Sequence, residues 1–154
     1  TKTIAANTTI MNTHNPLLDA LLSKKYEEAS RKGVMVYFDL PDLRDMPMDQ
    51  TDLVIMLSNL LNNAIEAAAQ ADPPEVYVRM RKSEDEVVLS VRNRVKKDLN
   101  LADGQLPRIS QKGAGHGFGL WNVQDVLKKY GGEYTISCRE CWFRFTCTIP
   151  LGKL

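Results

Sequence analysis

The apolar residues of this chain recur with two different periods, and the order in which these periods alternate constrains the fold most. A period of about 3.6 residues, typical of a helix buried on one face, begins after Asn15 and Pro16, two standard start signals. Alternation of every second residue, typical of strands, fills most of the intervals between the helical stretches. The pattern predicts helices over 16–32, 48–71 and 117–130, and strands over 34–40, 76–81, 87–93, 133–138 and 141–149.

This order of elements predicts a single two-layer domain. Three amphipathic helices on one face of a mixed five-stranded sheet is the simplest packing, an α+β two-layer sandwich. A chain of 154 residues is long enough to bury a core of its own, and no linker-like segment divides it. Residues 1–154 are therefore expected to form one domain.

Charge and cysteine content exclude several classes of protein. The chain has 20 Lys and Arg against 19 Asp and Glu, so its net charge of +1 indicates neither a nucleic-acid partner nor a membrane surface. It contains no apolar run of the roughly 20 residues that a membrane span requires, and its start lacks the pattern of a signal peptide. Cys138 and Cys141 have zinc-like spacing, but Cys147 and two distant histidines complete no tetrad, so structural thiols in a reducing cytosol are favoured.

The predicted second helix carries a stripe of polar residues. At 100° per residue, the stripe spans little more than a quarter-turn and comprises Asp52, Asn59, Asn62, Asn63, Glu66 and Gln70. A solvated face is the simplest explanation, yet the stripe contains no cation, and its three asparagines together cost roughly 2 kcal/mol of helix propensity. Carboxamide and carboxylate oxygens are ligands that Mg²⁺ accepts beside phosphates. A face that binds a magnesium nucleotide is therefore favoured over a solvated one.

The predicted strand over 87–93 places a polar residue among apolar ones. Asn93 lies on the same face of the strand as the apolar residues that point toward the helices. A buried amide without a partner costs about 1–3 kcal/mol, so it should bond either a neighbouring backbone or a ligand such as an adenine edge. On the opposite face we expect four arginines close together, namely Arg79, Arg81, Arg92 and Arg94. No aromatic residue is expected between them, which favours a solvated sheet face over a nucleic-acid patch.

Four of the nine glycines fall within residues 113–119, between an irregular stretch over 95–114 and the start of the third predicted helix. Glycines at such a junction let backbone N–H groups approach phosphate oxygens, and the helix dipole favours the negative charge. Lys112 and His116 can add charge or hydrogen bonds there. The cluster contains neither a P-loop nor the third glycine of a dinucleotide fingerprint. Together with the asparagine stripe, it favours phosphate binding over a simple hinge.

These segments together resemble the ATP-binding catalytic domain of sensor histidine kinases in the GHKL superfamily. Residues 59–67, Asn-Leu-Leu-Asn-Asn-Ala-Ile-Glu-Ala, are similar to the N box, and residues 115–120 are similar to the second glycine box. The ending from Tyr130-Gly-Gly to Pro150 is similar to that of the family, and the leading segment resembles the branch of AgrC-like peptide-sensing kinases. The resemblance implies a Bergerat-type fold, ATP and Mg²⁺ as ligands, and quorum sensing as the context.

The resemblance also implies roles for individual residues. Asn63 would bind Mg²⁺, Asn59 would contact phosphate or the attacking group, and Glu66 is a candidate catalytic residue where many kinases have lysine. Asn93 stands where the family has its adenine-reading aspartate, and residues 95–114 would be the ATP lid. The end of the lid and the phosphate cradle would comprise Lys112, Gly115, His116, Gly117, Gly119 and Leu120.

The same resemblance implies partners outside these 154 residues. Neither His14 nor His116 fits the phosphoacceptor, so the acceptor histidine is expected on dimerisation helices upstream of residue 1. The parent protein is expected to be a homodimeric, membrane-anchored bacterial receptor that has a response regulator as its partner and this domain in the cytoplasm, with no nucleic-acid partner.

The first glycine box departs from the family pattern, because Asp-x-Gly-x-Gly is replaced by Asn93-Arg-Val-Lys-Lys97, which predicts weaker adenine binding. Two alternatives therefore stay open at this point. One is a nucleotide-sensing protein-interaction module with degenerate catalysis, and the other is an anti-sigma-factor-type serine kinase.

Overall fold

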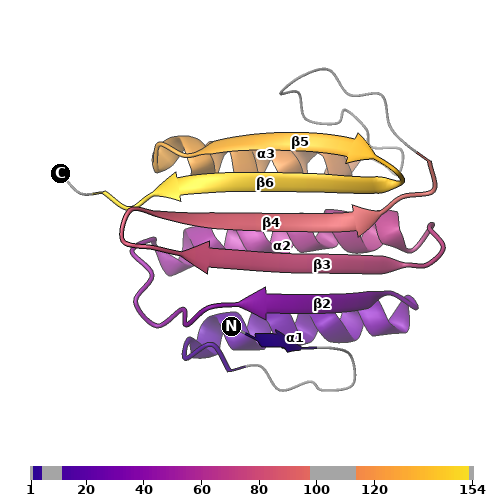
Figure 1. Cartoon of the computed structure of the whole chain (residues 1–154), viewed down its shortest axis with the longest axis horizontal. Coiled ribbons are helices and arrows are strands. Elements are labelled where there is room, and N and C mark those ends of the chain that lie inside the picture. The colour runs from indigo at the N-terminus through magenta and orange to yellow at the C-terminus, as the bar shows by residue number, and fades with distance from the viewer. Residues whose placement is uncertain (1, 5–11, 98–113, 153–154) are drawn as a thin grey trace.

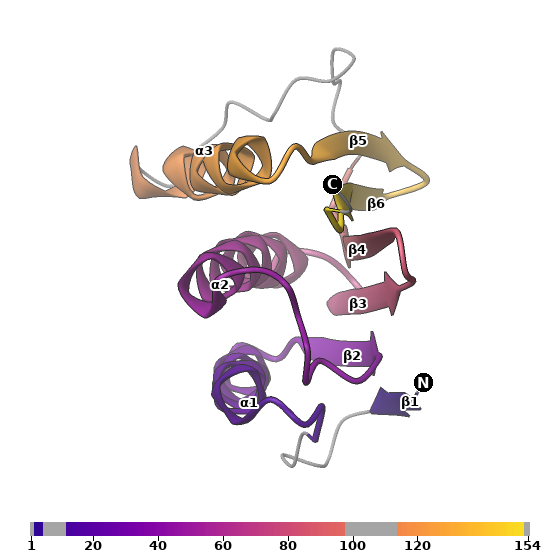
Figure 2. The ribbon, with the colours of Figure 1, turned by 90° about the vertical axis from the view of Figure 1, so that its left-hand side faces the viewer.

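The structure is a computed structural model that describes residues 2–4, 12–97 and 114–152, without the side chains of 2–4 and 114–119. Within this part of the chain, all helices lie on one face of a single sheet (Figures 1 and 2). The predicted two-layer α+β arrangement is confirmed. None of the described helices combines the length and the apolar character needed to cross a membrane.

The described helices and strands follow the predicted order. The helices are α1 (Pro16–Arg31), α2 (Gln50–Ala68) and α3 (Ala114–Lys129). The strands are β1 (Lys2–Ile4), β2 (Met35–Leu40), β3 (Glu75–Lys82), β4 (Glu86–Arg94), β5 (Glu133–Arg139) and β6 (Trp142–Pro150). Helix α2 is shorter than predicted, because the side chain of Asp49 accepts a hydrogen bond from the backbone N–H of Thr51 and caps the helix there.

The sheet has the order β1-β2-β3-β4-β6-β5. Strands β2 and β3 are parallel and all other neighbours are antiparallel, so the sheet is mixed, as predicted. The predicted five strands are all present, but β1 adds a sixth at the edge beside β2. A strand of three residues is too short to show a period, which is why the sequence pattern did not reveal it.

The core fills the space between the helices and the inner face of the sheet. The residues of α2 predicted to supply it are all at most 3% exposed: Leu53, Leu57, Leu60, Leu61, Ala64 and Ala68. From β6, Phe145, Cys147 and Ile149 pack against them, as their alternation predicts. Burial raises the pKa of the Cys147 thiol to about 12, so this cysteine is a neutral core residue at physiological pH.

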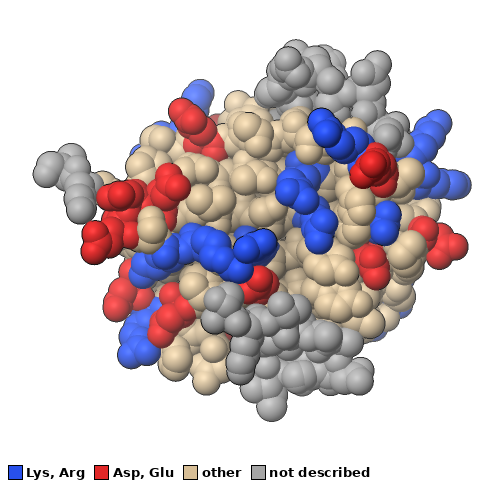
Figure 3. Space-filling view, in the orientation of Figure 1, with Lys and Arg blue, Asp and Glu red and all other residues tan. Residues whose placement is uncertain are grey.

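The outer face of the sheet differs from the prediction. The expectation that Arg79 and Arg81 lie near Arg92 and Arg94 holds only in part: Arg79 pairs with Ser90 and is diagonal to Arg92, whereas Arg81 pairs with Val88, farther from both. Lysines and arginines accordingly form two groups on this face (Figure 3). Aromatic residues do interleave with the second group, since the guanidinium of Arg92 lies 4.5 Å from the ring centre of Tyr77 and 4.7 Å from that of Trp142.

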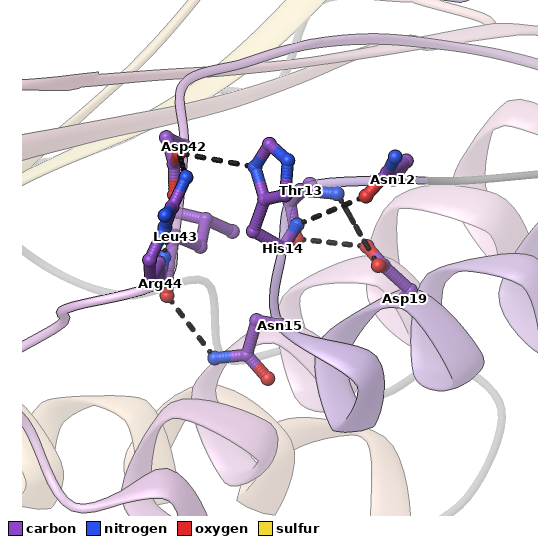
Figure 4. A network of polar contacts seen from close by, with 8 residues as sticks. All are labelled: Asn12, Thr13, His14, Asn15, Asp19, Asp42, Leu43 and Arg44. Atoms are coloured by element: carbon purple, nitrogen blue, oxygen red, sulfur yellow. Dashed lines mark hydrogen bonds and ion pairs between the residues drawn. The ribbon is translucent and has the colours of Figure 1, made fainter.

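The start of α1 is held to the segment that follows β2 (Figure 4). Asn15 is the N-cap, as predicted: its Oδ1 accepts from the backbone N–H of Leu18, and its Nδ2 donates to the Leu43 carbonyl at 3.2 Å. Thr13 donates from its backbone N–H and its hydroxyl to the carboxylate of Asp19, in the first turn. These bonds fix the start of α1 against the segment between β2 and α2.

Candidate functional site

A polar clamp joins the start of α2 to the end of α3. The carboxylate of Asp52 accepts hydrogen bonds from Lys129 Nζ at 2.8 Å and from the Tyr130 hydroxyl at 2.6 Å. The Tyr130 oxygen in turn accepts from the backbone N–H of Asp49 at 3.1 Å. These bonds hold the pKa of Asp52 below its ordinary value, because they favour the ionised carboxylate. Asp52, which belongs to the stripe predicted to bind a ligand, therefore bonds α3 instead and has a structural role.

The clamp joins the start of α2 to the end of α3, and the two helices pack together antiparallel (Figure 1). The positions of residues farther along each helix can therefore be compared. Asn63 lies eleven residues beyond Asp52, about 16 Å along the axis at ~1.5 Å per residue. Gly117 lies twelve residues before Lys129, about 18 Å along α3 by the same rise. The second half of α2 thus lies beside the glycine-rich start of α3.

The end of β4 lies at the same end of the domain. Helix α3 leads into β5, whose first residue pairs with Thr148, and Thr148 pairs with Val88 near the start of β4. The end of α3 is therefore level with the start of β4, and its beginning is level with the other end of that strand, where Asn93 lies (Figure 1). The fold thus brings the N-box asparagines, the glycine cluster and Asn93 to one end of the domain.

The three adjacent asparagines of α2 have different surroundings. Asn62 accepts a hydrogen bond from Lys25 Nζ of α1 at 2.7 Å, so it joins the two helices and does not belong to the ligand face. Asn59 is half-buried and donates from Nδ2 to the Ile55 carbonyl at 2.9 Å, which fixes the plane of its amide.

Asn63 is half-buried, and its Nδ2 is fully buried with no hydrogen-bond partner among the described residues. Such an N–H donor costs about 1–3 kcal/mol and calls for an acceptor such as a phosphate oxygen, whereas a hard cation would be held by the Oδ1 of the same amide. Asn59 and Asn63 lie one turn apart on the same face of α2, so two carboxamides are available together. Glu66, three residues beyond Asn63, is also half-buried. This donor set fits a hard cation beside phosphate groups.

Asn93 is 2% exposed at the inner face of the sheet, as its parity predicts. Its Nδ2 donates to the Arg94 carbonyl at 3.0 Å. Of the two expected partners, a neighbouring backbone or a ligand, the structure therefore shows the backbone. Contact with an adenine edge stays a prediction.

The glycine cluster lies farther into the helix than expected. Helix α3 begins at Ala114, three residues before the predicted start, so Gly115, His116, Gly117 and Gly119 all belong to its first two turns. Leu120 is 7% exposed and packs in the core. Residues 98–113 of the predicted lid, Lys112 among them, lie outside the described residues. The first lid residue, Val95, donates its backbone N–H to the Cys141 carbonyl in the β5–β6 turn.

Solved catalytic domains of histidine kinases have the same fold. A nucleotide-free form of the catalytic domain of the histidine kinase ThkA aligns with a TM-score of 0.69 and 22% identity over 97% of this chain and 96% of that chain. The histidine kinase AdeS of Acinetobacter baumannii aligns with a TM-score of 0.67 and 13% identity, covering 99% of this chain and 68% of that one. The fold is therefore that of the catalytic domain of histidine kinases.

The sequence comparison identifies the family. Residues 48–150 match the family model described as GHKL domain, and the chain belongs to this family. Among curated proteins, the sensor protein CitS of Bacillus subtilis (strain 168) is 28% identical over an alignment of 155 positions, and the alignment covers 92% of this chain and 27% of that protein. The sensor histidine kinase DpiB of Escherichia coli (strain K12) is 28% identical over an alignment of 145 positions, which covers 86% of this chain and 26% of that protein. The chain thus spans about a quarter of the length of these relatives.

Proposed function

We propose that this chain is the ATP-binding catalytic domain of a sensor histidine kinase, which transfers the γ-phosphoryl group of ATP to a histidine on a separate helical domain. The observation that carries the proposal is the buried, unpartnered amide of Asn63, one turn from Asn59 and beside the glycine-rich start of α3. Membership of the GHKL family and the similarity to sensor kinases support it.

Phosphoryl transfer depends mainly on positioning and on neutralisation of charge, and the residues of the site are suited to both tasks. Asn63 would hold Mg²⁺, which when bound neutralises charge on the phosphate oxygens. Asn59 would contact phosphate or the attacking group, and Glu66 is a candidate catalytic residue one turn farther along α2. The free N–H groups in the first turn of α3 would face the phosphates, where the glycines allow close approach.

The parent protein, we further propose, is a homodimeric, membrane-anchored receptor. In such a receptor, upstream helices carry the phosphoacceptor histidine, this domain lies in the cytoplasm, and a response regulator receives the phosphoryl group. The names of CitS and DpiB, a sensor protein and a sensor histidine kinase, support the sensor role of such a parent protein. The AgrC-like branch and a quorum-sensing role rest on the resemblance of the leading segment alone.

Calorimetric titration of the chain with Mg-ATP tests the nucleotide site. We expect measurable binding that requires Mg²⁺, because two carboxamides and a helix N-terminus converge at the site. Absence of heat at millimolar nucleotide would contradict the proposal. The matched variants are Asn63→Ala and its neighbour Asn62→Ala, which removes the same group from a residue that contacts α1.

Labelling with ATP that carries a radioactive γ-phosphate tests the transfer. The chain alone should take up no label, whereas the natural protein with its preceding helices should form an acid-labile, base-stable phosphohistidine. Nucleotide binding without any transfer would indicate a sensing module instead. Acid-stable phosphoserine on a partner would indicate a serine kinase of the anti-sigma-factor type.

A further inference from the structure

The outer face of the sheet carries a cluster of aromatic and arginine side chains that the nucleotide site does not use. We call it the aromatic–arginine patch, and it consists of Tyr37, Tyr77, Arg92, Arg94, Trp142 and Arg144. The described helices all lie on the other face of the sheet (Figure 2), so none of them covers this patch. The patch spans four adjacent strands, from β2 through β3 and β4 to β6.

Ring stacking and cation–π contacts order the patch. Tyr37 and Tyr77 stack with their ring centres 4.6 Å apart, and Tyr77 meets Trp142 edge-on at 5.6 Å. The guanidinium of Arg92 lies over the rings of both Tyr77 and Trp142, and that of Arg94 lies 4.2 Å from the Trp142 ring centre. Side chains held in this way lose little further conformational entropy when a partner binds, so the patch is preorganised.

The patch also carries positive charge that the described residues do not neutralise. Arg92 and Arg144 stand directly opposite each other on β4 and β6, and like charges in this position destabilise a sheet. Burial and the nearby Arg144 lower the pKa of Arg92. Glu75 lies 3.8 Å from Arg94, whereas no carboxylate among the described residues forms an ion pair with Arg92 or Arg144.

Arg79 and Arg81, farther along β3 on the same face, share one carboxylate. Asp39 accepts from both terminal nitrogens of Arg81, at 3.0 and 3.3 Å, and lies 3.9 Å from Arg79. Asp39 thus serves both arginines there, whereas Glu75 serves only Arg94 in the patch, so among the described residues Arg92 and Arg144 have no carboxylate partner.

We propose that the aromatic–arginine patch is a docking surface for an acidic segment of a partner protein. Tryptophan, tyrosine and arginine are the residue types that contribute most binding energy at protein interfaces, and carboxylates would provide the missing counter-charge. A second copy of the chain would place arginines against arginines. The near-neutral chain, with a net charge of +1, lacks the basic excess typical of nucleic-acid binding.

Fluorescence anisotropy with a defined probe tests the proposal. The probe is a fluorescein-labelled peptide of four Glu-Glu-Phe repeats, and the comparison ligands are its Lys-Lys-Phe counterpart and a labelled dT12 oligonucleotide. The full chain should bind the acidic peptide, more weakly as the salt concentration rises, and should not bind the lysine peptide. Equal binding of the two peptides, or tighter binding of dT12 than of the acidic peptide, would overturn the proposal.

Two exposed arginines on the same face provide a matched pair of variants. Arg144→Gln removes a charge from the patch, and we expect it to weaken binding of the acidic peptide about tenfold, as loss of one charged hydrogen bond does. Arg79→Gln removes the same charge from beside the Asp39 carboxylate and should change the affinity less than about twofold. If both variants weaken binding equally, the peptide does not dock on the patch.

Thermal unfolding of the free chain is a second readout that needs no partner. Arg144→Gln should raise the melting temperature by about 1–3 °C, because it removes the repulsion of Arg92. Arg79→Gln should not raise it, since Arg79 lies beside Asp39. A melting temperature lowered by Arg144→Gln would show that the patch carries no unrelieved charge and would contradict the proposal.

Discussion

The two halves of helix α2 carry one continuous polar stripe and use it in opposite ways. In the first half, the carboxylate of Asp52 accepts hydrogen bonds from Lys129 and Tyr130, and the bonds tie α2 to the end of α3. In the second half, the amide nitrogen of Asn63 is buried with no partner among the described residues. The difference teaches that a polar residue on a helix face marks a polar contact, while its neighbours decide whether the protein or a ligand supplies the partner.

Replacing the unpartnered amide is the strongest way to break this comparison. Asn63→Ala should weaken Mg-ATP binding more than about 100-fold, since the metal loses its ligand. The same change should leave the melting temperature unchanged or higher, because it removes an unsatisfied buried group and adds helix propensity. Calorimetry and thermal unfolding measure the two effects.

Asn62→Ala is the control for that variant. Its amide bonds Lys25, so its loss should lower the melting temperature and change nucleotide affinity less than about threefold. Equal loss of affinity in the two variants would mean that the stripe acts through helix stability and not through ligation.

Removing the charge of Asp52 should have the next largest effect. Its pKa is depressed in the folded chain, so its stabilising contribution is full above pH ~4 and disappears as the pH falls below that value. Asp52→Asn should therefore lower the melting temperature at pH 7 and reduce the loss of stability between pH 4 and pH 2. Thermal unfolding over this range measures both effects.

The exposed Asp125 of α3 provides a control, because Asp125→Asn removes a carboxylate from the same helix pair outside the clamp. The clamp's electrostatic role would be refuted if Asp52→Asn and Asp125→Asn shifted the acid unfolding curve by the same amount.

The smallest effect is expected from the hydroxyl of Tyr130. Tyr130→Phe removes one donor to Asp52 and one acceptor for the backbone of Asp49, while the ring stays in place. A loss of about 1 kcal/mol corresponds to a fall of about 2–4 °C in melting temperature for a chain of this size. Nucleotide affinity should not change, and a calorimetric titration that shows a large loss would connect the clamp directly to the site.

Much of the fold could be predicted because its signals are local. The cap at Asn15, the alternation of β4 and the apolar face of α2 all depend on residues a few positions apart. Strand β1 was missed because three residues show no period, and the cap of α2 at Asp49 was missed because Pro47, itself a signal for a helix start, lies two residues before it.

The candidate site could be predicted only in part. The spacing of the N box and the glycines indicated α2 and the start of α3, and the parity of Asn93 correctly indicated its burial. The spacing could not separate Asn62 from Asn63, which are the same residue type at neighbouring positions. Their difference depends on Lys25, 37 residues away in the sequence.

By itself, the sequence determined which segments are helices and strands, which faces are apolar, and that asparagines and glycines gather in two motifs. These properties depend on the direction in which each side chain points relative to those a few positions away, which repeats every 3.6 residues in a helix and every 2 in a strand. Tertiary structure alone decided which polar groups find partners within the chain, and it placed Trp142 beside arginines of β4. Strand register and helix packing bring together residues tens of positions apart, and no local pattern specifies those distances.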